Sequence, residues 1–229
     1  MHEVTHISYG NGGVDVVLDS SSQTSVAAPN FRFGNYTTLV SSCFTPKELD
    51  RISEGNSAEI TFYFAVTDEI EDELLKTQYR EAIEQNEAVI GNLNEGILID
   101  VDVKKTIGND APTDILSCAD DVELQMDIPL FLIKENRSYF VLADKGGEFV
   151  LLPDSTPDAD VLTVKTHSFV PGILLYQDPK ESLLEKEDSI FRIEMRHVLL
   201  GGIVLLIVLW VFIDYLHKKV INTFHLSLI

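Results

Sequence analysis

Apolar and polar residues alternate in several short stretches of this chain, which is the pattern of strands that bury one face. In the clearest stretch every second residue from Ala58 to Val66 is apolar, and Glu59, Thr61 and Tyr63 lie between them. Turn residues separate these stretches about every ten residues, which predicts a mainly β fold, an antiparallel β-sandwich. The other expected strands lie at 14–18, 97–104, 122–130, 139–143, 148–152, 161–166 and 173–176.

Two segments have the period of a helix instead. Thr45-Pro46-Lys47-Glu48 is a capping box with proline at the first helical position, so it predicts a short helix that Gly55 is placed to end. Between Thr67 and Asn86 the apolar residues form one stripe, which predicts an amphipathic helix inserted between two strands and lying against a sheet. The stripe consists of Ile70, Leu74, Leu75, Tyr79, Ala82 and Ile83.

A continuous apolar run near the C-terminus has neither pattern. Every residue from Val198 to Ile213 is apolar or glycine, and with Tyr215 and Leu216 the stretch reaches about 19 residues, or roughly 28 Å of helix. This length matches the hydrocarbon core of a bilayer and predicts a C-terminal transmembrane helix. A buried core helix is the alternative, but such helices rarely run this long without a polar face.

The residues at the end of this run also favour a membrane anchor. Trp210 and Tyr215 stand where aromatic rings prefer the headgroup level, and Lys218 and Lys219 follow directly. We therefore expect the lipid bilayer to be one partner of the chain. The residues expected to mark the anchor are Val198, Leu205, Trp210, Phe212, Lys218 and Lys219.

These elements divide the chain into five expected parts. Residues 1–44 form an N-terminal β segment, with the remnant of a preceding domain as one interpretation, and 45–177 form the β-sandwich module. Residues 178–196 contain a second capping box, Ser182-Leu183-Leu184-Glu185, and predict a charged juxtamembrane helix. The transmembrane helix is expected at 197–217, and 218–229 is a short tail.

The charge of the chain excludes some partners. The formal net charge is −20, and the part before the anchor is even more acidic because only Asp214, Lys218 and Lys219 are charged after Arg196. Nucleic-acid binding needs a basic surface, so no nucleic-acid partner is expected, nor adsorption of the whole domain onto anionic lipid. A soluble, self-repelling surface is the expected consequence, and a role in holding divalent cations is the alternative.

The two cysteines, Cys43 and Cys118, fit neither a metal-binding spacing nor a C-x-x-C motif. They form either one long-range disulfide or two small buried residues. The sequence cannot show whether they meet, and the second interpretation is slightly favoured.

The chain contains no recognisable catalytic motif: G-x-S-x-G, S-x-x-K, P-loop and H-E-x-x-H patterns are all absent. The six histidines are scattered, and His167 is expected to be a partly exposed turn residue rather than a base. No enzyme activity, cofactor or metal site is therefore expected.

Two sets of acidic residues are candidates for a catalytic or a metal site. Asp100 and Asp102 share one strand face and resemble a solvated surface beside Lys104 more than a glycosidase pair. A proline-bounded loop could help bind Ca²⁺ but lacks the D-x-D-x-D-G pattern; its carboxylates are Asp154, Asp158 and Asp160.

The order of segments between residues 45 and 177 adds a resemblance. It runs through TPKELDRI, ILIDVDVKKTIG, MDIP, SYFVLADKGGEFVLLP and LTVKTHSFVPGILLYQD. This order resembles the membrane-proximal β module of large cell-surface proteins of Gram-positive Firmicutes. The resemblance implies a module that follows repeats and precedes an anchor; it carries no functional residues, and the LPxTG motif of such anchors is missing here.

The resemblance implies a single-pass protein of the cell membrane with most of the chain outside, acting as a spacer or presenting upstream binding domains. The alternatives are a module that itself binds a glycan or a protein outside the cell, and a tail-anchored intracellular adaptor. Met1-His2-Glu3-Val4 has no features of a signal peptide, which fits either a fragment of an exported protein or a tail-anchored one. The count of basic residues on the two sides of the anchor slightly favours a domain inside the cell. These residues are Lys186, Arg192 and Arg196 before the anchor, and Lys218 and Lys219 after it.

Overall fold

The computed structural model describes residues 1–67, 70, 72–156 and 160–179, and Met1–Pro179 form one unit. Strands dominate this unit and form two sheets, so the mainly β prediction is confirmed. The predicted transmembrane helix, most of the juxtamembrane segment and the tail lie outside the described residues.

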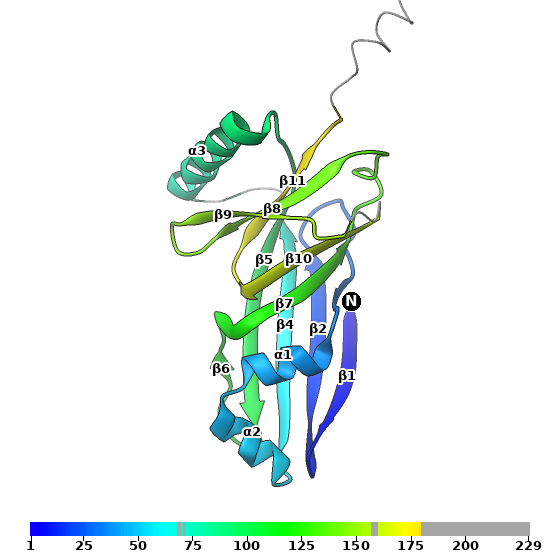
Figure 1. Cartoon of the computed structure of the whole chain (residues 1–229), viewed down its shortest axis with the longest axis vertical. Helices are drawn as coiled ribbons and strands as arrows, with labels where there is room; N and C mark the ends of the chain where they lie inside the picture. Colours follow the sequence, from blue (N-terminus) through cyan, green and yellow to red (C-terminus); the bar gives the residue numbers. More distant parts are fainter. Residues whose placement is uncertain (68–69, 71, 157–159, 180–229) are drawn as a thin grey trace, which may run out of the picture. The chain divides into compact units, whose positions relative to one another are not determined.

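The larger sheet has eight strands (Figure 1). Its order along the hydrogen-bonded path is β1-β2-β4-β5-β11-β8-β9, and the short β6 pairs with β5. The strands are β1 (His2–Tyr9), β2 (Gly12–Ser22), β4 (Ser57–Thr67), β5 (Asn94–Ile107), β6 (Thr113–Asp114), β8 (Ser138–Asp144), β9 (Phe149–Pro153) and β11 (Gly172–Gln177).

A smaller sheet covers one face of the larger one. It contains β3 (Phe31–Phe33), β7 (Ser117–Asp127) and β10 (Val161–Ser168) in the order β10-β7-β3. Two short helices, α1 (Tyr36–Cys43) and α2 (Pro46–Ser53), complete this layer, and α1 contacts β7 (Figure 1). The main core lies between the layers, and rings from both sheets meet there: Phe31 stacks on Phe64 with centroids 3.9 Å apart.

The long helix α3 (Glu73–Ile90) lies against the opposite side of β8, β9 and β11, where it forms a second core cluster. It follows β4 and precedes β5, and these two strands pair directly with each other, so the predicted insertion is confirmed. Tyr79, Ala82 and Ile83 of the predicted stripe are buried, but Leu74 is exposed. The helix begins at Glu73 rather than at Thr67, because the Asp72 carboxylate caps its first amides.

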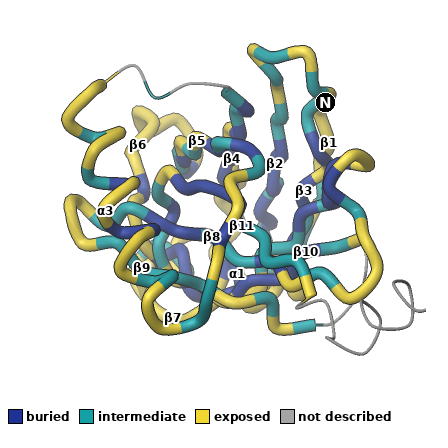
Figure 2. Tube along the Cα trace, turned by 90° about the horizontal axis from the view of Figure 1, so that it is seen from above, coloured by how far each residue is buried: buried dark blue, intermediate teal, exposed yellow. Residues whose placement is uncertain are grey.

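Burial follows this layering. Figure 2 shows buried residues concentrated in the strands, and exposed ones on the outward side of α3 and in the turns. In β11 the side chain of Leu174 joins the main core, while Ile173 and Leu175 join the cluster under α3. The strands β8 and β11 are therefore covered on both faces, which explains why β11 is a nearly continuous apolar run.

The pairing is not antiparallel throughout, which corrects the sequence-based prediction. β2 and β4 are parallel neighbours, with Val16 opposite Ile60 and Leu18 opposite Phe62. Parallel neighbours require a crossover connection, and the chain provides one through β3, α1 and α2. The sheet is mixed for this reason.

Residues 1–44 belong to the same unit as the strands that follow. β2 is an interior strand between β1 and β4, and Val14 and Val16 are fully buried. Phe31 and Leu39 belong to the same core. Removing this part would therefore leave β4 paired with β5 alone and open the main core.

Candidate functional site

The residues predicted to form the membrane anchor, from Val198 to Lys219, lie outside the described residues. Among the described residues, no helix combines the length and apolarity needed to cross a bilayer. The anchor therefore remains a sequence-based prediction. The described unit offers four other places to consider: an apolar cleft, a disulfide, a basic clamp and the acidic surface.

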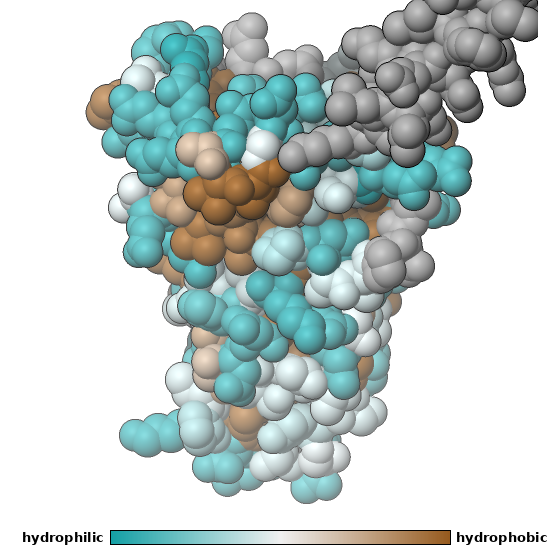
Figure 3. All heavy atoms as spheres, turned by 45° about the horizontal axis from the view of Figure 1, so that its top comes forward, coloured by the Kyte–Doolittle hydropathy of each residue, from teal (hydrophilic) through white to brown (hydrophobic). Residues whose placement is uncertain are grey.

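The apolar cleft lies between the two sheets. Strands of both sheets line it, β7 and β10 with Phe31 of β3 on one side and β4, β5, β8, β9 and β11 on the other, and its volume is about 50 Å³. Its only hydroxyl-bearing residues are Thr166 and Ser168. Small-molecule sites usually enclose roughly 300–1,000 Å³, so this cleft fits an aliphatic side chain better than a substrate or cofactor. Figure 3 shows hydrophobic side chains gathered on the surface below α3, in the region of the β8–β9 hairpin.

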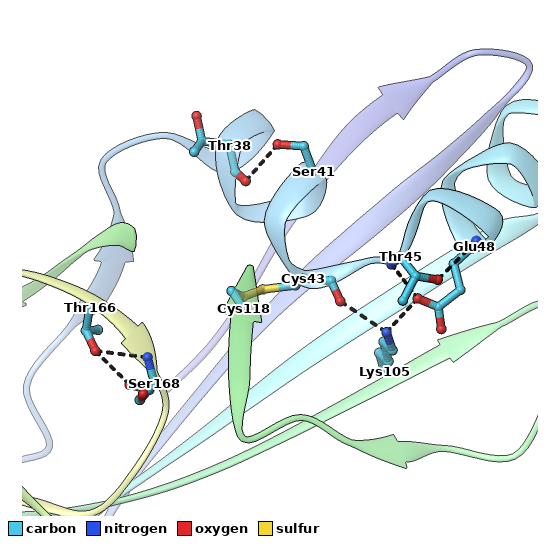
Figure 4. Close-up of a disulfide and its surroundings, with 9 residues drawn as sticks. All are labelled: Thr38, Ser41, Cys43, Thr45, Glu48, Lys105, Cys118, Thr166 and Ser168. Atoms are coloured by element: carbon cyan, nitrogen blue, oxygen red, sulfur yellow. Dashed lines mark hydrogen bonds and ion pairs between the residues drawn. A yellow bond between two sulfur atoms is a disulfide. The ribbon is translucent and has the colours of Figure 1, made fainter. Parts of the chain in front are cut away.

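The disulfide joins Cys43, the last residue of α1, to Cys118 near the start of β7 (Figure 4). The two Cα atoms are 4.5 Å apart, although 75 residues separate them in the chain. The slightly favoured interpretation of two unbonded cysteines is thus wrong. Their meeting depends on α1 packing against β7, a contact between distant segments that neither spacing nor periodicity encodes.

A partly buried ion pair between α2 and β5 lies next to the disulfide. The predicted capping box is present: the Glu48 carboxylate accepts a hydrogen bond from the Thr45 amide at 2.7 Å. The Lys105 ammonium of β5 donates to the same carboxylate at 2.7 Å and to the Cys43 carbonyl oxygen at 3.1 Å (Figure 4). Lys105 therefore ties α1 and α2 to the large sheet beside the sulfur atoms.

Electrostatics favour the charged form of this pair. Burial alone would raise the pKa of Glu48, but the hydrogen bonds from Lys105 and Thr45 and the charge of Lys105 outweigh it and hold the pKa below its ordinary value. Such an arrangement fixes structure and offers no group suited to proton transfer near neutral pH.

The basic clamp lies at the other end of the unit and was not predicted. Lys134 and Arg137, from the loop between β7 and β8, both donate to one oxygen of Asp178, at 3.0 and 2.9 Å. Arg137 also donates to the Leu132 carbonyl at 2.7 Å, and its guanidinium lies 3.9 Å from the centroid of the Tyr176 ring. The hydrogen bonds from Lys134 and Arg137 lower the pKa of Asp178. The clamp fixes the end of β11, just before Pro179.

The acidic candidates do not form a catalytic pair. Asp100 and Asp102 are both exposed on the outer face of β5, and Asp102 pairs with Lys104 at 2.8 Å, as expected for a solvated face. The Asp154 carboxylate accepts hydrogen bonds from the Thr156 and Thr163 amides, so it orders its own turn.

The histidine and metal-ligand candidates do not come together in a site either. Asp160 is exposed, and Asp158 lies outside the described residues. His167 is exposed on β10 and pairs with Asp121 at 2.9 Å; it lies in a strand rather than in the expected turn. Within the part of the chain that the structure describes, no group of three or more metal-ligating side chains comes together.

Comparison of the chain with models of protein families, with curated proteins and with solved structures gave no match.

Proposed function

We propose that this chain is a non-enzymatic module of the cell surface, tethered to the membrane by its C-terminal apolar segment. In this role the β unit is a rigid spacer that holds upstream domains away from the envelope. The resemblance to the membrane-proximal module of Firmicutes surface proteins supports this proposal.

The observation that carries the proposal is the Cys43–Cys118 disulfide. Both cysteines of the chain take part in it. Disulfides persist in oxidising compartments and are rare in the cytosol, so a buried structural disulfide favours a domain exposed outside the membrane over a tail-anchored adaptor inside. The strongly acidic composition is compatible with that location, since a surface of one sign of charge repels its own copies and stays in water.

The small volume and apolar lining of the cleft between the sheets fit a packing role for that cleft better than a substrate site. A spacer must resist deformation, and the unit has the features for this: a disulfide that joins α1 to β7, the interior strand β11 and a clamp on the end of that strand.

The experiment that tests the anchor is vesicle flotation of the full chain. The wild type is expected to float with the vesicles. A variant with Leu205→Arg and Phe212→Arg is expected to stay at the bottom, because arginine within a span opposes insertion, most strongly near the centre, where Leu205 lies. A wild type that also stays at the bottom contradicts the proposed anchoring.

A second candidate, a glycan-binding module, is favoured by one observation. Tyr63 of β4 is exposed on the open face of the large sheet, next to Asp102 in the pairing and with Lys104 5.9 Å from its ring centroid. An exposed ring between polar groups can stack on a sugar. Glycan-array binding that disappears in Tyr63→Ala would support this candidate over the spacer.

A further inference from the structure

Two adjacent large apolar side chains project from the loop between β7 and β8, residues 128–137, here called the 128–137 loop. Leu130 is 87% exposed and Phe131 is 61% exposed. The next residue, Leu132, is buried. Exposed apolar residues that occur together and not singly often mark a contact surface.

This exposure results from a well-defined backbone. The strand β7 was expected to continue to Leu130 but ends at Asp127, because Pro129 has no amide hydrogen to donate to a sheet. The Leu132 amide then donates to the Pro129 carbonyl at 2.8 Å. The Leu132 carbonyl accepts hydrogen bonds from the Tyr139 hydroxyl at 2.8 Å and from Arg137 at 2.7 Å. The loop is thus anchored on both sides of Leu130 and Phe131.

The 128–137 loop lies at the end of the unit from which the chain continues to the predicted anchor. Lys134 and Arg137 of this loop hold Asp178, and Ser138 pairs with Gln177 at the end of β11 (Figure 1). Seventeen residues, 180–196, separate the unit from the predicted anchor. Even fully extended, this connection spans at most roughly 60 Å.

Local charges do not oppose a lipid contact. The domain as a whole is acidic, but the two carboxylates that flank the loop are both ion-paired: Asp127 binds Arg32 at 2.6 Å, and Asp178 binds Lys134 and Arg137. The loop itself has one carboxylate, the exposed Glu135, beside the two basic side chains. It therefore presents two apolar side chains on a segment of small net charge, which suits shallow entry into the interface of a bilayer.

We propose that Leu130 and Phe131 insert into the interface of the bilayer to which the C-terminal segment is anchored, so that the domain rests on the membrane through the 128–137 loop. This inference rests on the proposed anchoring. Two side chains would bind a vesicle weakly by themselves, but a tether keeps them at a high effective concentration near the lipid.

Trp210, the only tryptophan of the chain, lies in the predicted anchor and makes the test possible. The full chain is placed in phosphatidylcholine–phosphatidylglycerol vesicles that contain lipids brominated on the acyl chains, which quench indole fluorescence on contact. The wild type reports on the anchor. The variants Phe131→Trp and Leu130→Trp, each combined with Trp210→Phe, report on the loop.

The matched control is Leu116→Trp combined with Trp210→Phe. Leu116 is 73% exposed but precedes Cys118 at the disulfide end of the unit. We expect bromolipid to quench the Phe131→Trp and Leu130→Trp indoles and shift their emission to shorter wavelength, and to leave the Leu116→Trp indole unchanged. Lipids brominated near the headgroup should quench the loop indoles more than lipids brominated near the chain ends.

Each outcome has a separate meaning. Quenching in the wild type without quenching in either loop variant overturns the loop insertion and leaves the anchor in place. A loop indole whose emission shifts without quenching indicates a protein contact, such as a second copy, and also overturns it. No quenching in the wild type contradicts the proposed function itself.

Discussion

The two ends of the described unit are built in different ways. At one end the Cys43–Cys118 disulfide and the Lys105–Glu48 pair join α1, α2, β5 and β7. At the other end the clamp of Arg137 and Lys134 on Asp178 fixes the end of β11, and Leu130 and Phe131 remain in solvent. The disulfide end holds the layers together. The clamp end fixes the point where the chain exits the unit, and its apolar side chains stay exposed. The bonds that hold α1 and α2 to β5 and β7 are thus separated in space from the exposed apolar pair Leu130 and Phe131.

The largest expected effect comes from the disulfide end. The double variant Cys43→Ser, Cys118→Ser is expected to lose about 2–4 kcal/mol of unfolding free energy, because the bond closes a long loop of the unfolded chain. Urea unfolding of the full chain in detergent measures this loss. The wild type in reductant should be as unstable as the variant. If the variant and the oxidised wild type are equally stable, the disulfide does not stabilise this end of the unit.

The next largest loss of stability is expected at the opposite end, in the clamp. Arg137→Ala removes a nearly buried side chain that donates to the Leu132 carbonyl and stacks on Tyr176. We expect a loss of about 1–2 kcal/mol from these two contacts, measured by the same urea unfolding. Lys134→Ala is the matched control: Lys134 binds the same Asp178 oxygen from a half-exposed position, and its loss should leave stability nearly unchanged. Equal losses in both variants would show that the pairing with Asp178, and not the packing of Arg137, fixes β11.

A smaller effect depends on pH. The pKa of Glu48 is lowered in the folded state, so its ion pair contributes stability above the ordinary glutamate pKa, 4.5, and loses it as the pH falls through the folded-state pKa. Glu48→Gln should cost about 1 kcal/mol at neutral pH and less at acidic pH. Thermal unfolding between neutral pH and pH 3 checks this.

The control for the pH effect is Glu54→Gln, an exposed glutamate at the end of the same helix, α2. It should unfold like the wild type at every pH. If Glu48→Gln loses stability on acidification as steeply as the wild type, then Glu48 does not supply the pH dependence of the disulfide end.

The smallest expected change in stability is in the 128–137 loop. Leu130→Ser with Phe131→Ser should alter the free energy of unfolding by less than about 0.5 kcal/mol, since both side chains are exposed. Leu132→Ala, at a buried position of the same loop, should lose about 2–5 kcal/mol and serves as the contrast. Urea unfolding distinguishes the two; a large loss in the serine variant would assign Leu130 and Phe131 to the core instead of to a contact surface.

Local patterns predicted much of this structure. The alternation in β4 was sufficient to predict that strand, because every second side chain from Ala58 to Val66 faces the main core. The capping box at Thr45 and the hairpin of β8 and β9 were predictable for the same reason: the interactions that define them lie within a few residues.

The features that local patterns missed depend on distant contacts. The parallel pairing of β2 with β4 depends on how the segment between them crosses the sheet, and the disulfide on the packing of α1 against β7. Leu130 continues the alternation of β7, but Pro129 ends the strand and the loop turns the side chain outward. The only sign of that change in the sequence was the proline.

The central claim is that an oxidised β domain stands outside the membrane on a C-terminal anchor. Adding protease to intact cells that produce the full chain tests it most directly, with lysed cells as the control. We predict that the domain is cleaved from intact cells and recovered with the Cys43–Cys118 bond formed. A domain that resists protease until the cells are lysed, and that carries two free thiols, would contradict this account.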